Sequence, residues 1–105
     1  MPEMEEFNNV ITITPTLESI EDEADAIIKT VKGILENRNC KIIFDLYHVK
    51  YFGNSGLNLL IWINNVTCAR GEKIVIKGLR PQMEKAFKVT RLDKVFEIIP
   101  GTLPQ

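Results

Sequence analysis

The sequence has 105 residues, of which 45% are hydrophobic and 26% are charged, and its formal net charge is -1 at pH 7. This length and composition predict one domain, residues 1–105, with one hydrophobic core. Lysine and arginine are spread along the chain without gathering into a basic stripe, so nucleic acid is not an expected partner.

Residues 1–6 are acidic and lack the charged and apolar regions of a signal peptide. The longest apolar stretch, residues 57–63, is interrupted by Asn58 and is too short to span a membrane. We therefore expect a cytoplasmic protein without direct membrane insertion. Cys40 and Cys68 lack the spacing of a metal or redox motif, so both are expected to be small buried hydrophobic residues.

The first predicted elements are a hairpin and a helix. Residues 10–14 alternate β-branched side chains, which predicts a strand with one apolar face. Residues 4–7 could form its partner strand at the edge of the sheet, because the intervening Asn8-Asn9 pair is a turn signal. Residues 17–37 carry an apolar stripe at helical spacing, which predicts an amphipathic helix.

The first half of that helix is strongly acidic. No loop pattern of the calcium-binding type accompanies the cluster, so we interpret it as a solvated helix start and expect no metal site. The cluster consists of Glu18, Glu21, Asp22, Glu23 and Asp25.

Residues 41–46 form a short, nearly continuous apolar run, which is typical of a central strand covered on both faces. Residues 56–70 predict a helix, in which Asn58 and Asn65 mark one polar line and Trp62 borders it. Gly71 suits the end of this helix.

The last predicted elements are a strand at residues 73–77, a turn at Gly78, a short helix opened by Pro81 and a strand at residues 95–99. The inward side chains of the short helix are expected to be Met83, Ala86, Phe87 and Leu92. The order of elements predicts an α/β fold with a mixed sheet of four to five strands. Its first strand is antiparallel, and helices cross between the parallel strands.

Catalysis is not expected. His48 is the only histidine, and a nucleophile-and-base pair with Ser55 would need an orienting third group that the sequence does not supply. Neither a GxGxxG nor a GxxxxGK phosphate-binding loop occurs. We therefore expect no enzyme, no catalytic residue, no metal and no cofactor.

The chain resembles the STAS domain, a family named for sulfate transporters and anti-sigma factor antagonists. The resemblance rests on the strand at residues 41–46, the sequence Phe-Gly-Asn-Ser-Gly-Leu at residues 52–57, and the segments 71–76 and 92–98. It implies a STAS-like fold and a small regulatory binding module. In bacterial members the first serine of the signature is phosphorylated by an anti-sigma factor kinase, and only the unphosphorylated form binds its partner.

The chain departs from this family pattern at the phosphorylated position. When the motif is aligned on Gly56, the family's phosphoacceptor serine falls on Asn54, and Ser55 matches a second serine that is usually unmodified. Asparagine is neutral and a strong N-cap, so Asn54 could cap the helix, contact a partner, or do both. The resemblance therefore implies a module that this phosphorylation does not switch, with Ser55 as the alternative phosphoacceptor.

The expected partner is a regulatory protein, either an anti-sigma factor or serine kinase-like protein, or a phosphatase. Many family members carry another helix after the last strand, which residues 100–105 are not expected to form past Pro100. Some surface is therefore expected to be bare, and either a second copy of the chain, making a homodimer, or another partner could cover it. Two alternatives remain open: an accessory subunit of a membrane transporter, and a small α/β enzyme or ligand-binding domain. The expected partner-binding residues are Gly53, Asn54, Ser55, Gly56, Asn58 and Trp62, and the enzyme alternative would use His48, Tyr51 and Ser55.

Overall fold

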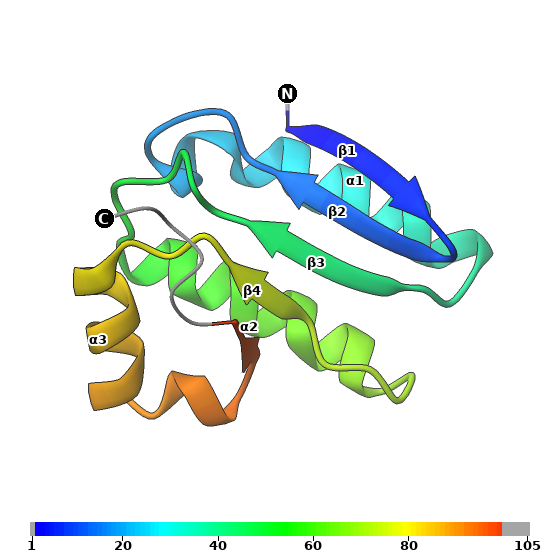
Figure 1. The fold of residues 1–105 in the computed structure, drawn as a ribbon. Helices are drawn as coiled ribbons and strands as arrows, with labels where there is room; N and C mark the ends of the chain where they lie inside the picture. Colours follow the sequence, from blue (N-terminus) through cyan, green and yellow to red (C-terminus); the bar gives the residue numbers. More distant parts are fainter. Residues whose placement is uncertain (1, 100–105) are drawn as a thin grey trace.

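The computed structural model of the chain describes residues 2–99 as an α/β fold with one mixed sheet (Figure 1). The strands of the sheet are β1 (Glu3–Phe7), β2 (Val10–Thr14), β3 (Lys41–Asp45), β4 (Val75–Lys77) and β5 (Glu97–Ile98). The helices are α1 (Ala24–Asn37), α2 (Asn54–Cys68) and α3 (Pro81–Val89), with 3-10 turns η1 (Ile20–Glu23) and η2 (Leu92–Lys94). This order confirms the predicted sequence of elements.

The strands follow one another across the sheet in the order β1-β2-β3-β4-β5. The first two form an antiparallel hairpin in which Phe7 pairs with Val10, and the remaining neighbours are parallel. Asn8 and Asn9 make the turn with φ of 50° and 63°. Asparagine tolerates this left-handed backbone better than most residues, which explains the tight hairpin.

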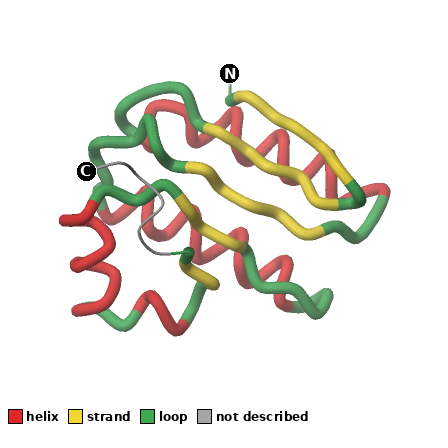
Figure 2. The backbone as a smooth tube through the Cα atoms, in the orientation of Figure 1, coloured by secondary structure: helices red, strands yellow, loops and turns green. Residues whose placement is uncertain are grey.

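Helices α1 and α2 lie behind the sheet, and the parallel strands all point toward the edge where α2 begins (Figures 1 and 2). β3 is central as predicted, but it is fully covered on one face alone. Ile42 and Phe44 are buried under the helices, whereas Ile43 is half-buried on the opposite face. The prediction that both faces of β3 are fully covered was therefore wrong. Side chains alternate between the two faces of a strand, and the apolar side chain on the second face, Ile43, is only partly buried.

The predicted helix over residues 17–37 is in fact η1 followed by α1, and its acidic start is only partly solvated. Glu23 is 4% exposed, and its carboxylate accepts hydrogen bonds from the backbone amides of Thr16 and Leu17. The prediction of a solvated cluster was wrong at this position. A loop entering the core has amide groups that need partners, and the Glu23 carboxylate supplies one.

Two further burial predictions were wrong. Cys40 is buried, and burial raises the pKa of its thiol, but Cys68 is exposed because it lies at the last turn of α2. In α3 the buried line consists of Met83 and Phe87, four residues apart, while Ala86 lies beside that line and is exposed. The prediction about residues 100–105 lies outside the described residues.

Buried Asn64 links α2 to the sheet. Its side chain donates to the carbonyl of Val95 and accepts from the amide of Ile74, with 3.0 Å between the heavy atoms in each bond. The exposed polar line of the same helix, Asn58 and Asn65, is present as predicted. Within residues 2–99, no helix combines the length and apolar character needed to cross a membrane.

Candidate functional site

The predicted binding turn lies where β3 leads into α2, at the carboxyl edge of the parallel strands (Figure 1). Gly53 is the N-cap, with extended backbone angles of φ -99° and ψ -175°, and its carbonyl accepts a hydrogen bond from the amide of Leu57 at 3.2 Å. Asn54 is already the first helical residue and is exposed. The expected capping role of Asn54 is wrong, because capping is performed by the side chain of the extended residue before the helix.

Glu21 of η1 takes the place of a capping side chain. Its Oε1 accepts a hydrogen bond from the Gly53 amide at 2.8 Å, and its Oε2 accepts one from the Ser19 hydroxyl at 2.9 Å. Burial opposes ionisation of this carboxyl, but these bonds, with others from the backbone of Glu21 and Gly56, hold its pKa below the usual 4.5. The carboxylate therefore accepts hydrogen bonds from backbone amides at the start of α2, which would otherwise lack partners, and its negative charge interacts favourably with the helix dipole.

The contact between η1 and α2 is close enough to require a glycine. A Cβ atom added at Gly56 would lie 2.3 Å from Oε1 of Glu21 and 2.5 Å from Cγ2 of Ile20. The carbonyl of Glu18 also accepts hydrogen bonds from the amides of Lys50 and Tyr51, at 2.7 and 3.0 Å. Segment 18–21 thus holds the loop and the first turn of α2 in one arrangement.

Three of the predicted site residues share one face of α2 beyond this turn. Ser55, Asn58 and Trp62 recur at helical spacing and lie along a groove of about 500 Å³ between α1 and α2. Leu59 also lines it, and we call this surface the α1/α2 groove. Trp62 is 40% exposed, so a large aromatic surface is available beside polar side chains.

Helix α1 supplies the other wall of the α1/α2 groove, which the sequence interpretation missed. Ala24, Ile28 and Lys32 line it, and the Lys32 ammonium lies 5.9 Å from the centre of the Trp62 ring. Ala24 and Ile28 lie within the segment 17–37 for which an apolar helix stripe was predicted, yet both are only partly buried. The apolar stripe of α1 is wider than the surface that the core covers, so residues at its edge remain partly exposed. The width of the stripe in the sequence was the signal that could have predicted this groove wall.

The residues named for the enzyme alternative, His48, Tyr51 and Ser55, do not line one common cavity. Ser55 faces the α1/α2 groove, Tyr51 lines a different cavity, and the His48 ring stacks on Tyr47 with 3.9 Å between centroids. Across the described part of the chain, no three His, Cys, Asp or Glu side chains are grouped as metal ligands.

Comparisons with known proteins agree on one family. The sequence model of the STAS domain matches residues 1–102. The structure of an anti-sigma factor antagonist from Mycobacterium paratuberculosis aligns with a TM-score of 0.78 at 19% identity, covering 95% of this chain and 85% of that one. An anti-sigma-factor antagonist (STAS) domain protein from Planctomyces limnophilus gives 0.77 at 20% identity, covering 92% and 87%.

The Bacillus cell fate determinant SpoIIAA in its phosphorylated form aligns with a TM-score of 0.66 at 15% identity, covering 96% of this chain and 93% of that one. At these identities the solved structures show a shared fold, and the family match covers nearly the whole sequence.

Proposed function

Because the chain belongs to the STAS domain family, we propose that residues 1–105 act as one non-catalytic regulatory module that binds a signalling protein through the start of α2 and the α1/α2 groove. Its fold resembles that of anti-sigma factor antagonists. The proposed partner is an anti-sigma factor or serine kinase-like protein, or a phosphatase, and the proposed compartment is the cytoplasm.

One observation carries the proposal: an exposed tryptophan lies over a groove beside a helix start that is held rigidly in place. Trp62 is 40% exposed and is flanked by Ser55 and Asn58, which can form hydrogen bonds at the rim. Tryptophan is enriched at the energetic centres of protein interfaces because it buries a large area with few rotatable bonds. The hydrogen bond that the Gly53 amide donates to Glu21 already orders the turn, so little order needs to be gained on docking.

The proposal includes the loss of the family's usual phosphorylation switch. Asn54 occupies the position that the family resemblance assigns to the phosphoacceptor serine, and it is exposed at the first helical residue. The carboxamide of Asn54 has no hydroxyl to be phosphorylated. The charge of the docking surface therefore does not change at this position, and the surface stays able to bind its partner. Ser55 is the alternative acceptor, since a phosphate there would add roughly two negative charges inside the α1/α2 groove.

The test is direct binding of the purified chain to purified serine kinase-like anti-sigma factors from the source cell, measured by calorimetry. Asn54→Asp places a negative charge at the first helical residue and Trp62→Ala removes the aromatic surface. Asn39→Asp, exposed in the loop between α1 and β3 and outside the groove, is the matched control. We expect binding by the unchanged chain and the control, and loss of binding by the other two variants.

Equal binding by all four proteins would contradict the proposed surface. Copurification with a membrane transport ATPase and no affinity for any kinase-like protein would favour the accessory-subunit alternative. Incubation with the partner kinase and ATP tests the missing switch, because stoichiometric phosphate on Ser55 would overturn it.

A further inference from the structure

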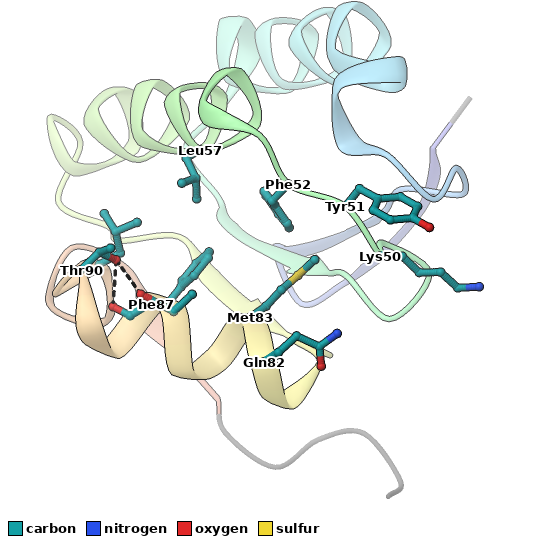
Figure 3. Close-up of a pocket in the computed structure, with 10 residues that line it drawn as sticks. Lys50, Tyr51, Phe52, Leu57, Gln82, Met83, Phe87 and Thr90 are labelled. Atoms are coloured by element: carbon teal, nitrogen blue, oxygen red, sulfur yellow. Dashed lines mark hydrogen bonds between the residues drawn. The ribbon is translucent and has the colours of Figure 1, made fainter.

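A second cavity lies on the opposite side of α2 from the α1/α2 groove, between the loop that precedes α2 and helix α3 (Figure 3). Its volume is about 340 Å³. The apolar part of its wall consists of Phe52, Leu57, Met83, Ala86, Phe87 and Leu92. We call it the α2/α3 cavity.

The walls of the α2/α3 cavity are set by packed side chains. Phe87 is 3% exposed and contacts Phe52 edge to face, with 6.1 Å between ring centres, and Met83 is 9% exposed. Small-molecule sites in proteins are commonly preformed cavities of roughly 300 to 1,000 Å³ with apolar walls and a few polar groups. The volume of the α2/α3 cavity lies within this range, and two of its apolar wall residues are buried.

Three of the four polar lining residues lie at one end of the cavity, and the fourth, Thr90, lies beside Phe87, where its hydroxyl donates to the backbone carbonyls of Ala86 and Phe87 (Figure 3). In Figure 3, Lys50, Tyr51 and Gln82 lie toward the same side, away from Leu57 and Phe87. Among the lining residues Lys50 alone is charged, and its ammonium pairs with the carboxylate of Glu18 outside the lining, so an anion at this end would compete with that ion pair.

Lys50 is available to such an anion. Its ammonium lies 3.4 Å from Oε1 of Glu18, and the two side chains are 47% and 59% exposed. An ion pair this exposed contributes roughly 0 to 1 kcal/mol, so a ligand that offers apolar burial as well can compete for the lysine. Tyr51 and Gln82 each add a hydrogen-bond donor at the same rim.

We propose that the α2/α3 cavity binds a small amphipathic carboxylate, whose short acyl chain packs against the apolar wall and whose carboxylate contacts Lys50, Tyr51 and Gln82. Two other occupants fit the cavity less well than a carboxylate. An apolar side chain of a partner protein would contact the apolar wall but not Lys50, and the phosphates of a nucleotide carry more negative charge than one lysine can balance. The proposal does not depend on docking at the α1/α2 groove, because the two surfaces are lined by different residues.

The test is an amide NMR titration of the full chain with octanoate, octanol and acetate. Octanoate should give saturable shifts at residues 50–52, 57 and 82–92, while acetate should give none. Octanol lacks the anion and should bind about tenfold more weakly, the loss expected for one charge-assisted hydrogen bond. Lys50→Gln should abolish this difference between octanoate and octanol.

Two variants separate cavity binding from binding elsewhere. Ala86→Trp adds bulk at an exposed wall residue and should abolish the octanoate shifts. Val89→Trp adds the same bulk on the same helix outside the cavity and should leave them unchanged, since Val89 is 74% exposed. The proposal is overturned if octanoate gives no saturable shifts, if the shifts centre on the α1/α2 groove, or if Ala86→Trp binds octanoate as tightly as Val89→Trp.

Discussion

The carboxylate of Glu21 accepts a hydrogen bond from the backbone amide of Gly53 at 2.8 Å, across 32 positions of sequence. This bond joins η1 to the first turn of α2 and does what a capping side chain would do. The proposed docking surface includes this junction. The contribution of the Glu21–Gly53 hydrogen bond to stability and the effect of the Glu21 charge can both be tested.

Replacing Glu21 with alanine should loosen the start of α2. The variant loses the acceptor for the Gly53 amide and for the Ser19 hydroxyl, and we expect the free energy of unfolding to fall by about 1 to 2 kcal/mol. Urea denaturation measures the loss. Amide hydrogen exchange should accelerate at Gly53, whereas exposed Asp22→Ala serves as the control and should leave that rate unchanged.

The same junction predicts a dependence on pH. Because the folded-state pKa of Glu21 is lowered from 4.5, its ionised form stabilises the fold above that pH, and the stabilisation disappears as the pH falls through the folded pKa. Glu21→Gln should therefore be less stable than the unchanged chain at neutral pH. The difference between their unfolding free energies should shrink below pH 4.5. A difference that stays constant down to strongly acidic pH would contradict this charge effect.

Gly56 and Gly33 form a matched pair of helical glycines. A Cβ at Gly56 would lie 2.3 Å from Glu21 Oε1, so we expect Gly56→Ala to destabilise the chain by about 1 to 3 kcal/mol through overpacking. Gly33 in α1 has no atom within 4 Å of the added Cβ. Gly33→Ala should therefore stabilise by about 0.5 to 1 kcal/mol from helix propensity alone, as measured by thermal and urea unfolding. Shifts of the same sign would refute the close-contact argument.

Asn64→Leu should be strongly destabilising although leucine is a good helix former. The substitution leaves the carbonyl of Val95 and the amide of Ile74 without the bonds they make to the asparagine, at a cost of about 1 to 3 kcal/mol for each buried group. Asn65→Leu at the adjacent exposed position is the control and should change stability by less than about 0.5 kcal/mol. Denaturation midpoints of the two variants should differ clearly.

Trp62 is the only tryptophan, so its fluorescence reports on the α1/α2 groove. Docking of the proposed partner should bury the half-exposed ring and shift its emission to shorter wavelength. Trp62→Phe should bind more weakly while unfolding at nearly the same denaturant concentration, because the ring contributes more to docking than to the core. Unchanged emission at saturating partner would place the interface elsewhere.

The strands and helices could be predicted from sequence because their signals are local. Alternation in residues 10–14, the asparagine pair at the hairpin and Pro81 at the start of α3 each act within a few residues. The start of α2 was placed two residues late, at residue 56 where the structure has Asn54. Helix ends depend on which backbone groups find partners, and here the partner is distant in sequence.

The candidate site was predicted in part. Ser55, Asn58 and Trp62 do share a face, which helical spacing alone implies. The capping role predicted for Asn54 was wrong and the structural role of Glu21 was missed, because the capping group comes from another segment of the chain. A partner contact by Asn54 stays a prediction.

The α/β order of elements and the family resemblance could be inferred from the sequence, because hydrophobic period, turn residues and a short motif are read over neighbouring positions. Three features became visible in the folded chain alone: Glu21 accepts a hydrogen bond at the start of α2, Gly56 has no room for a side chain, and α1 supplies a wall beside Trp62. Each of these is a contact between segments far apart in the chain, and such contacts exist only once α1 and α2 pack on the same face of the sheet.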